Sequence, residues 1–199
     1  MGSENSQSVD ATAGARRPRA DAARNRERLI EAASAAFATG DKEVSLEAIA
    51  RDAGVGIGTL YRRYPTREAL LEAMAVRAYR LILAEAEDAL AQGETGLDAI
   101  GRFLRQTFAH RDELVLPLHG APMTEETESA ELRKQMQQTM GAIVTRGHRD
   151  GSVRPDVTAG AVVRFGAMLA RPMSAVPDWP EAAAEQRSIF LRGIAADSE

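Results

Sequence analysis

Residues 45–64 read SLEAIARDAGVGIGTLYRRY, and this stretch decides the fold of the chain. Ser45 is a preferred residue at the N-terminus of a helix. Apolar residues then recur at helical spacing, at Leu46, Ile49, Ala50 and Ala53. Gly54 supplies the positive φ that ends a helix in a tight turn, and Val55 plugs that turn. The stretch therefore predicts a short amphipathic helix followed by a turn.

A second short helix is predicted from about Ile57 to Arg63. Pro65 closes this helix, because a proline ring disfavours helix at the preceding residue. Leu60 points inward, which leaves an outer face of small, polar or basic residues, together with one isoleucine: Ile57, Gly58, Thr59, Tyr61, Arg62 and Arg63. Such a helix can enter a DNA major groove, about 12 Å wide, with its N-terminal residues nearest the base edges. The two helices together predict a helix-turn-helix motif over residues 45–64.

A longer helix is predicted on each side of this motif. The preceding helix starts at about Asp21 and stops at Gly40, with apolar residues at helical spacing at Leu29, Ile30, Ala33 and Phe37. The following helix is capped by Thr66, and its apolar stripe continues to about Leu90. This fourth helix is long enough to bridge two domains.

Residues 1–20 are rich in Ser, Ala, Gly, Asn and Arg without apolar periodicity, which predicts a disordered basic arm. Charge is distributed unevenly along the chain. Residues 1–80 hold 13 Lys and Arg against 11 Asp and Glu, whereas the remainder holds 12 against 18. The arm has two interpretations: Arg16, Arg17 and Arg19 contact the DNA backbone or minor groove, or they belong to a solubilising tail.

The chain after Gln92 also follows the helical period. Helices are predicted over about 95–108, 124–148, 156–169 and 178–194. Thr95, Asp156 and Asp178 are the expected caps of three of these helices. The alternation typical of strands is absent, and no internal repeat is present. The sequence therefore predicts an all-α protein.

The stretch GVGIGTLYRRYPTREALL, from Gly54 to Leu71, resembles the TetR family of transcriptional regulators, and with the preceding helix the resemblance reaches back to about Arg24. It implies base-facing positions at Ile57, Gly58 and Thr59, and phosphate contacts from Ser45, Tyr61, Arg63 and Arg67. Family members often have serine where Gly56 stands, so a hydroxyl contact to phosphate is lost there. Ile57 is left to contact a thymine methyl group, and DNA shape must supply part of the specificity.

The resemblance also implies an organisation and a function. A three-helix DNA-binding domain, residues 21–88 with its long fourth helix, precedes a C-terminal helical domain, residues 89–199, that dimerises and binds a small-molecule effector. A homodimer presents two recognition helices about 34–36 Å apart to a palindromic operator. We expect a ligand-responsive regulator, by family default a repressor, that its effector releases from DNA.

The C-terminal half has no comparably specific motif, so its ligand site is predicted from residue types. Candidates for an apolar lining and its polar anchor are Phe103, Phe108, His119, Met136, Met140 and Phe165. The same residues also suit an ordinary core, because Met and Phe at helical spacing commonly fill one. The helices over 156–169 and 178–194 are candidates for the dimer interface or, alternatively, for intrachain core.

Composition excludes several classes of function. The chain has no cysteine, its histidines lack metal-ligand spacing, and catalytic motifs are absent, so no metal, cofactor or enzymatic activity is expected. No apolar run reaches the roughly 20 residues of a membrane span and no secretory signal opens the chain, so we expect a cytoplasmic protein.

Two alternatives stay open: a helical enzyme, and an effector-independent architectural DNA-binding protein. The latter predicts a tightly packed C-terminal core instead of a cavity of several hundred Å³.

Overall fold

A computed structural model describes residues 11–38, 44–114, 127–171 and 176–196. It divides the chain into two compact units, Met1–Arg67 and Glu68–Glu199. The described residues form helices and no strand, and their extended backbone pairs only in an isolated bridge between Val153 and Ala195. The predicted all-α fold is confirmed.

The first unit contains three helices, α1 (Ala11–Ala38), α2 (Leu46–Asp52) and α3 (Ile57–Arg63). Their apolar sides meet in a small core that buries Leu29, Ile30, Ala33, Ile49, Ala50 and Leu60. The bounds of α3 agree with those predicted from the sequence, because the turn before it and the proline after it are both local signals.

The start of α1 differs from the prediction. The helix begins at Ala11 and not near Asp21, so residues 11–20 are helical where a disordered arm was expected. This segment holds four Ala and three Arg, which have high intrinsic helix propensity, but also Gly14 and Pro18, which oppose a helix, so its composition predicts no clear helix start. Residues 1–10 of the predicted arm lie outside the described residues.

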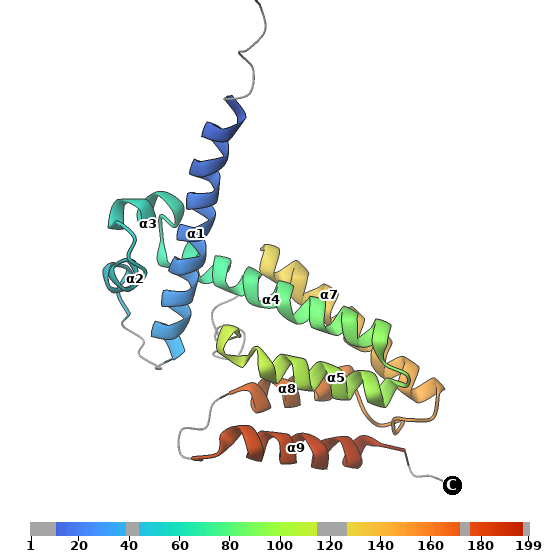
Figure 1. Ribbon diagram of the computed structural model, residues 1–199. Coiled ribbons are helices and arrows are strands. Elements are labelled where there is room, and N and C mark those ends of the chain that lie inside the picture. The colour runs from blue at the N-terminus through green and yellow to red at the C-terminus, as the bar shows by residue number, and fades with distance from the viewer. Residues whose placement is uncertain (1–10, 39–43, 115–126, 172–175, 197–199) are drawn as a thin grey trace, which may run out of the picture. The chain divides into compact units, whose positions relative to one another are not determined.

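The second unit contains α4 (Arg67–Gln92), α5 (Gly96–Ala109), the 3₁₀ turn η1 (Arg111–Glu113), α7 (Glu128–Arg149), α8 (Ala159–Ala170) and α9 (Trp179–Ile194). Helix α4 runs beside α7, α8 runs beside α9, and α5 contacts α7, α8 and α9 (Figure 1). From Ala75 to Ala89, α4 buries its apolar stripe in the core of this unit. The division at Arg67 therefore falls earlier than the predicted boundary after residue 88.

Helices α5 and α7 approach very closely at one end. A Cβ atom added to Gly96 would lie 2.2 Å from the Cα of Gly147, so only hydrogen fits there. The chain after α7 then satisfies the first amides of α5. Asp150 Oδ2 accepts from the Gly96 amide at 2.8 Å, and Ser152 Oγ accepts from the Leu97 amide at 3.0 Å. These contacts fix the end of α5 against the end of α7.

Threonine caps start several helices. Thr95 accepts from the Asp98 amide at the start of α5, as predicted, and Thr158 accepts from the Ala161 amide at the start of α8. The prediction that Asp156 caps α8 was wrong. Its carboxylate binds the Arg154 guanidinium at 2.7 Å, and Thr158 caps the helix instead.

Among the helices described, none combines the length and apolar character of a membrane span.

Candidate nucleic-acid interface and cavity

The turn between α2 and α3 has the predicted construction. Ser45 Oγ accepts from the Ala48 amide at 3.1 Å and caps α2. Gly54 has φ +62°, and the Val55 amide then donates to the Ala50 carbonyl at 2.9 Å. The Ser45 hydroxyl also donates to the Glu47 carboxylate, a bond that contributes to the lowered pKa of Glu47.

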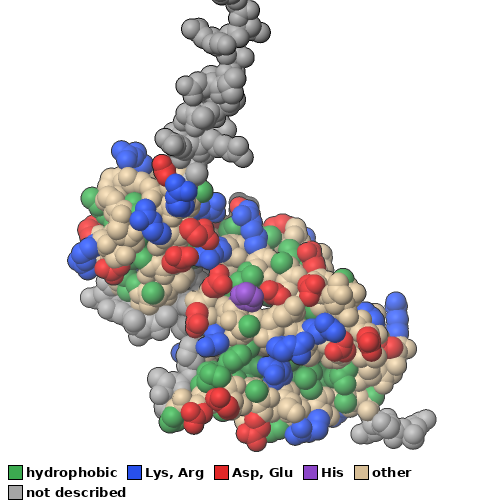
Figure 2. Space-filling model, viewed as in Figure 1, with side chains coloured by type: hydrophobic (Ala, Val, Ile, Leu, Met, Phe, Trp, Pro, Cys, Tyr) green, Lys and Arg blue, Asp and Glu red, His purple; other side chains and the backbone are tan. Residues whose placement is uncertain are grey.

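The outer face of α3 is exposed and small at its N-terminal end. Ile57 is 41% and Tyr61 43% exposed, whereas Leu60 is fully buried. A Cβ atom at Gly58 would meet no atom within 4 Å, so the helix backbone itself is accessible there. Figure 2 shows Lys and Arg side chains spread over the first unit with acidic side chains among them. The face can approach a surface closely and offers donors around that approach.

The Tyr61 hydroxyl is held by the neighbouring helix. It donates to Glu47 Oε1 at 2.9 Å, which joins α3 to the first turn of α2. The pKa of Glu47 is lowered first by a hydrogen bond from the Glu47 backbone amide and second by the bond from Tyr61. The bond between Tyr61 and Glu47 also raises the pKa of Tyr61. Glu47 is therefore ionised and Tyr61 protonated at neutral pH, and the bond is lost as the pH falls through the lowered pKa of Glu47.

The three remaining predicted DNA contacts differ in how far their side chains already make contacts within the protein. Arg63 is exposed at the end of α3, and Thr59 accepts from the Arg62 guanidinium at 3.1 Å. Arg67 is half-buried: it donates to the Val44 carbonyl at 2.9 Å and lies 4.9 Å from the centroid of the Phe37 ring. Arg67 thus also ties the start of α4 to the segment before α2 and to α1, a role that the sequence did not indicate.

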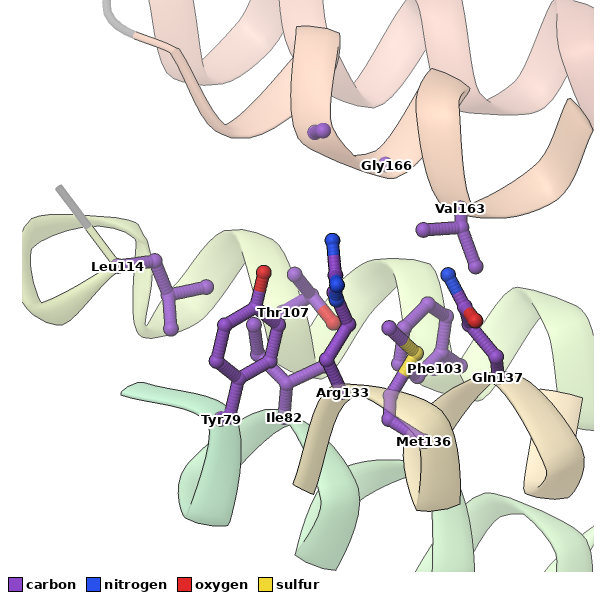
Figure 3. A pocket seen from close by; sticks show the side chains of 11 residues that line it. Tyr79, Ile82, Phe103, Thr107, Leu114, Arg133, Met136, Gln137, Val163 and Gly166 are labelled. Atoms are coloured by element: carbon purple, nitrogen blue, oxygen red, sulfur yellow. The ribbon is translucent and has the colours of Figure 1, made fainter. Parts of the chain in front are cut away.

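The second unit contains a partly open cavity of about 110 Å³ between α4, α5, α7 and α8. Figure 3 shows its walls and the polar side chains that reach it. The lining consists of Tyr79, Ile82, Phe103, Thr107, Leu114, Arg133, Met136, Gln137, Val163, Gly166 and Ala167. Most of these side chains are apolar, and the polar ones come from three different helices. Such a mixture is typical of small-molecule sites.

The predicted ligand residues are only partly brought together. Phe103 and Met136 line the cavity. Met140 is fully buried in the core of the second unit and does not belong to the lining. His119, the predicted polar anchor, lies outside the described residues.

Two predicted aromatic residues have other partners. The Arg111 guanidinium lies 4.7 Å from the centroid of the Phe108 ring at the end of α5. Phe165 of α8 stacks on Phe190 of α9, with ring centroids 3.9 Å apart and nearly parallel planes. Neither ring is among the described residues that line the cavity, so both favour the ordinary packing role that the sequence left open.

The polar lining was missed by the sequence analysis. Tyr79, Thr107, Arg133 and Gln137 sit in helices where a polar residue is expected to face solvent. Thr107 is only 6% exposed, and no described residue is a hydrogen-bond partner of its hydroxyl. A threonine among Phe103, Leu104 and Phe108 is a weak signal of a buried polar site, because burial depends on the packing of other helices.

Over the described ranges, no cluster of three His, Asp or Glu side chains could hold a metal ion.

Two family patterns match the chain. Residues 29–74 match the bacterial regulatory proteins of the tetR family, and residues 97–196 match the C-terminal domain of transcriptional regulators similar to SbtR. The first match contains α2, α3 and the start of α4, and the second contains α5 to α9. Among curated proteins, none matches the chain significantly.

Solved structures of similar fold cover nearly the whole chain. A TetR transcription regulatory protein from Mycobacterium vanbaalenii is 30% identical, with 89% of this chain and 99% of that one covered and a TM-score of 0.61. A TetR transcriptional regulator from Streptomyces coelicolor is 26% identical, with 87% and 99% covered and a TM-score of 0.57. The ketosteroid transcriptional regulator KstR2 of Mycobacterium tuberculosis shares the fold at 21% identity, with 86% and 95% covered and a TM-score of 0.68. With its helix-turn-helix unit and its second helical unit, this chain belongs to the TetR family of DNA-binding transcriptional regulators.

Proposed function

We propose that this regulator is a homodimeric repressor that binds a palindromic operator and releases it when a small molecule occupies the cavity of the second unit. The observation that carries this proposal is the cavity itself, with a buried Thr107 hydroxyl that no described residue satisfies. Buried polar groups in proteins are nearly always hydrogen-bonded, so an unpartnered one on a residue that lines a cavity favours a ligand that completes it.

The DNA contacts follow from the exposed face of α3. Ile57, Gly58 and Thr59 enter the major groove, where Ile57 contacts a thymine methyl group. Phosphate oxygens accept from Ser45, Tyr61, Arg63 and Arg67. The exposure of Ile57 and Tyr61 and the open space at Gly58 support this assignment. Because these positions offer few base-specific donors, DNA shape carries part of the recognition.

The homodimer forms through α8 and α9. Met168 of α8 is 72% exposed and Ile189 of α9 is 47% exposed, and large apolar side chains with such exposure favour a partner surface when they lie close to one another. Figure 2 shows hydrophobic side chains reaching the surface of the second unit on the side of α8 and α9. Two helices from each subunit then pack in an isologous interface.

Helix α4 supplies the physical link between ligand and DNA. Its first residue, Arg67, bonds to the Val44 carbonyl of the first unit, and farther along it carries Tyr79 and Ile82 to the cavity. A ligand that favours one position of α4 changes the presentation of α3 through this helix. The ligand needs only a different affinity for the two states.

An effector-independent repressor is the second candidate, and one observation favours it. A volume of about 110 Å³ is below the roughly 300–1,000 Å³ of sites for drug-sized ligands. On this alternative the cavity is a packing defect and operator binding has no small-molecule control.

The two candidates separate in an operator-release experiment. Binding of a labelled operator duplex is measured by fluorescence anisotropy while a protein-free small-molecule extract of the host cells is added. The proposed function predicts release of the wild-type protein, and no release of Val163→Phe, which fills the cavity but leaves α3 unchanged. Ala142→Phe, at an exposed position of α7 outside the lining, is the matched control and should behave as wild type. Release that is absent in every extract supports the effector-independent candidate. Release that persists in Val163→Phe overturns the assignment of the effector to this cavity.

A further inference from the structure

The cavity has an unbalanced charge. Arg133 of α7 is its one cationic lining residue among those described, and no described lining residue is acidic. The acids nearest along the same helix are engaged elsewhere: Glu128 binds Arg80, and Glu131 accepts from Gln135. No ion pair or hydrogen bond of Arg133 occurs within the described ranges. A half-buried guanidinium without an anion is costly, and an anionic ligand would relieve that cost.

Two hydroxyl groups accompany this cation. Thr107 is nine-tenths buried, and its hydroxyl lacks a partner among the described residues. Tyr79 is also buried; burial raises the pKa of its hydroxyl, although the nearby charge of Arg133 acts in the opposite direction. Figure 3 shows the polar ends of Tyr79 and Arg133 directed toward α8, and the Thr107 hydroxyl beside the stem of Arg133. At neutral pH the cavity therefore presents a cation and protonated hydroxyls.

The rest of the lining is apolar. Ile82, Phe103, Leu114, Met136 and Val163 provide most of the wall, and Gly166 and Ala167 keep the α8 side thin. This surface favours a hydrocarbon body and disfavours a ligand with several charges, such as a phosphate dianion, which needs more donors than the wall offers. The volume of about 110 Å³ suits a compact molecule.

We propose that the cavity binds a compact apolar molecule bearing one carboxylate, with Arg133 as its ion-pair partner and Thr107 as a further donor. This assignment rests on the proposed function, whose effector it names by chemical class. Guanidinium and carboxylate match in a bidentate geometry, which an amide, an alcohol or an amine cannot reproduce. The apolar body packs against Phe103 and Met136 from α5 and α7.

The test compares probes that share one ring and differ in charge. Benzoate, benzamide and benzylamine are titrated into the full-length protein by calorimetry, and the Met136 methyl group is followed by NMR with the Met74 methyl, outside the lining, as reference. We expect benzoate to shift the Met136 signal and to bind at least about 10-fold more tightly than benzamide, with benzylamine weakest. Acetate, butanoate, hexanoate and octanoate extend the series in size.

Variants identify the groups that recognise the charge. Arg133→Gln should weaken benzoate binding by about 10-fold or more and abolish the preference over benzamide. Lys134→Gln removes the same charge from an exposed neighbour on α7 and should change neither. Thr107→Val should weaken benzoate binding by roughly 3-fold to 10-fold. The assignment is overturned if benzamide binds as tightly as benzoate, if Arg133→Gln retains wild-type affinity, or if no carboxylate of the series shifts Met136.

Operator binding, measured in the same samples, separates this inference from the proposed function. If a carboxylate binds at Met136 but leaves operator affinity unchanged, the cavity does bind carboxylates, and the proposal that its ligand is the effector is overturned. Normal operator binding with no carboxylate bound overturns the ligand class and leaves the DNA-binding role intact.

Discussion

Tyr61, which we propose as a DNA contact, is already hydrogen-bonded within the protein. Its ring is exposed on α3, while its hydroxyl donates to Glu47 on α2. The hydroxyl has a single proton, so the bond to Glu47 competes with the proposed bond to a phosphate oxygen. The carboxylate of Glu47 also opposes DNA binding, because a negative charge on this face repels the DNA backbone.

Tyr61→Phe should weaken operator binding by about 10-fold, because a hydroxyl–phosphate bond is lost. Its unfolding free energy should change by less than about 0.5 kcal/mol, because the residue is a surface one. Glu47→Gln should strengthen operator binding and slightly increase its salt dependence, because salt no longer screens a repulsion on this face. Fluorescence anisotropy at several salt concentrations measures both variants. Wild-type affinity in Tyr61→Phe would show that the hydroxyl does not contact DNA.

Thr107 and Ser129 form a matched pair of buried hydroxyls. Thr107 has no described partner, whereas Ser129 donates to Glu72 Oε2 at 2.8 Å. Thr107→Val should raise the free energy of unfolding by about 1 kcal/mol, because it removes an unsatisfied group and keeps the shape. Ser129→Ala should lower it by about 1–3 kcal/mol, because the Glu72 carboxylate loses the hydroxyl donor and keeps only the backbone amide of residue 129. Urea denaturation without ligand measures both, and equal losses would contradict the assignment of Thr107.

At the scale of helices, the junction of α5 and α7 depends on two glycines. Gly96 and Gly147 permit the contact between the helices, and the Arg146 guanidinium donates to the carbonyls of Gly93 and Glu94, 2.6 Å from each, in the α4–α5 turn. The beginning of α5 is thereby attached to the end of α7.

Gly96→Ala should lower the free energy of unfolding by about 3 kcal/mol or more, because the added methyl group would meet the backbone of α7 at 2.2 Å. Gly141→Ala is the control on α7. A Cβ there meets no atom within 4 Å, so the variant should gain up to about 1 kcal/mol from helix propensity. Thermal and urea denaturation compare the two. A Gly96→Ala protein as stable as wild type would contradict the close approach.

The elements that sequence predicted well are those fixed by local chemistry. The bounds of α3 follow from Gly54 and Pro65, and the start of α5 follows from Thr95. The start of α1 and the cap of α8 were not predicted, because Ala-rich helix extension and the choice between neighbouring caps have weak local signals. The cavity was predicted only through Phe103 and Met136. Its polar residues come from helices distant in sequence, and their burial is decided by packing.

At the level of the whole molecule, the proposed operator binding requires two chains. The double variant Met168→Glu/Ile189→Glu places charges on the exposed apolar side chains of α8 and α9. It should be monomeric in analytical ultracentrifugation and bind operator about 100-fold more weakly, because paired half-sites give avidity. Gln135→Glu/Gln138→Glu, on the exposed side of α7, adds the same charge and should stay dimeric. A dimeric Met168→Glu/Ile189→Glu protein would place the interface elsewhere.

The most direct measurement is selection of bound duplexes from a random DNA pool, followed by sedimentation of the complex. We predict enrichment of an inverted repeat whose half-site centres are separated by about one helical turn, 34–36 Å, or a multiple of it, bound by two protein chains or a pair of dimers. Arg63→Ala should enrich no sequence under the same conditions. Enrichment of single, asymmetric sites bound by one chain, or unchanged enrichment by Arg63→Ala, would contradict the presentation of α3 to successive major grooves.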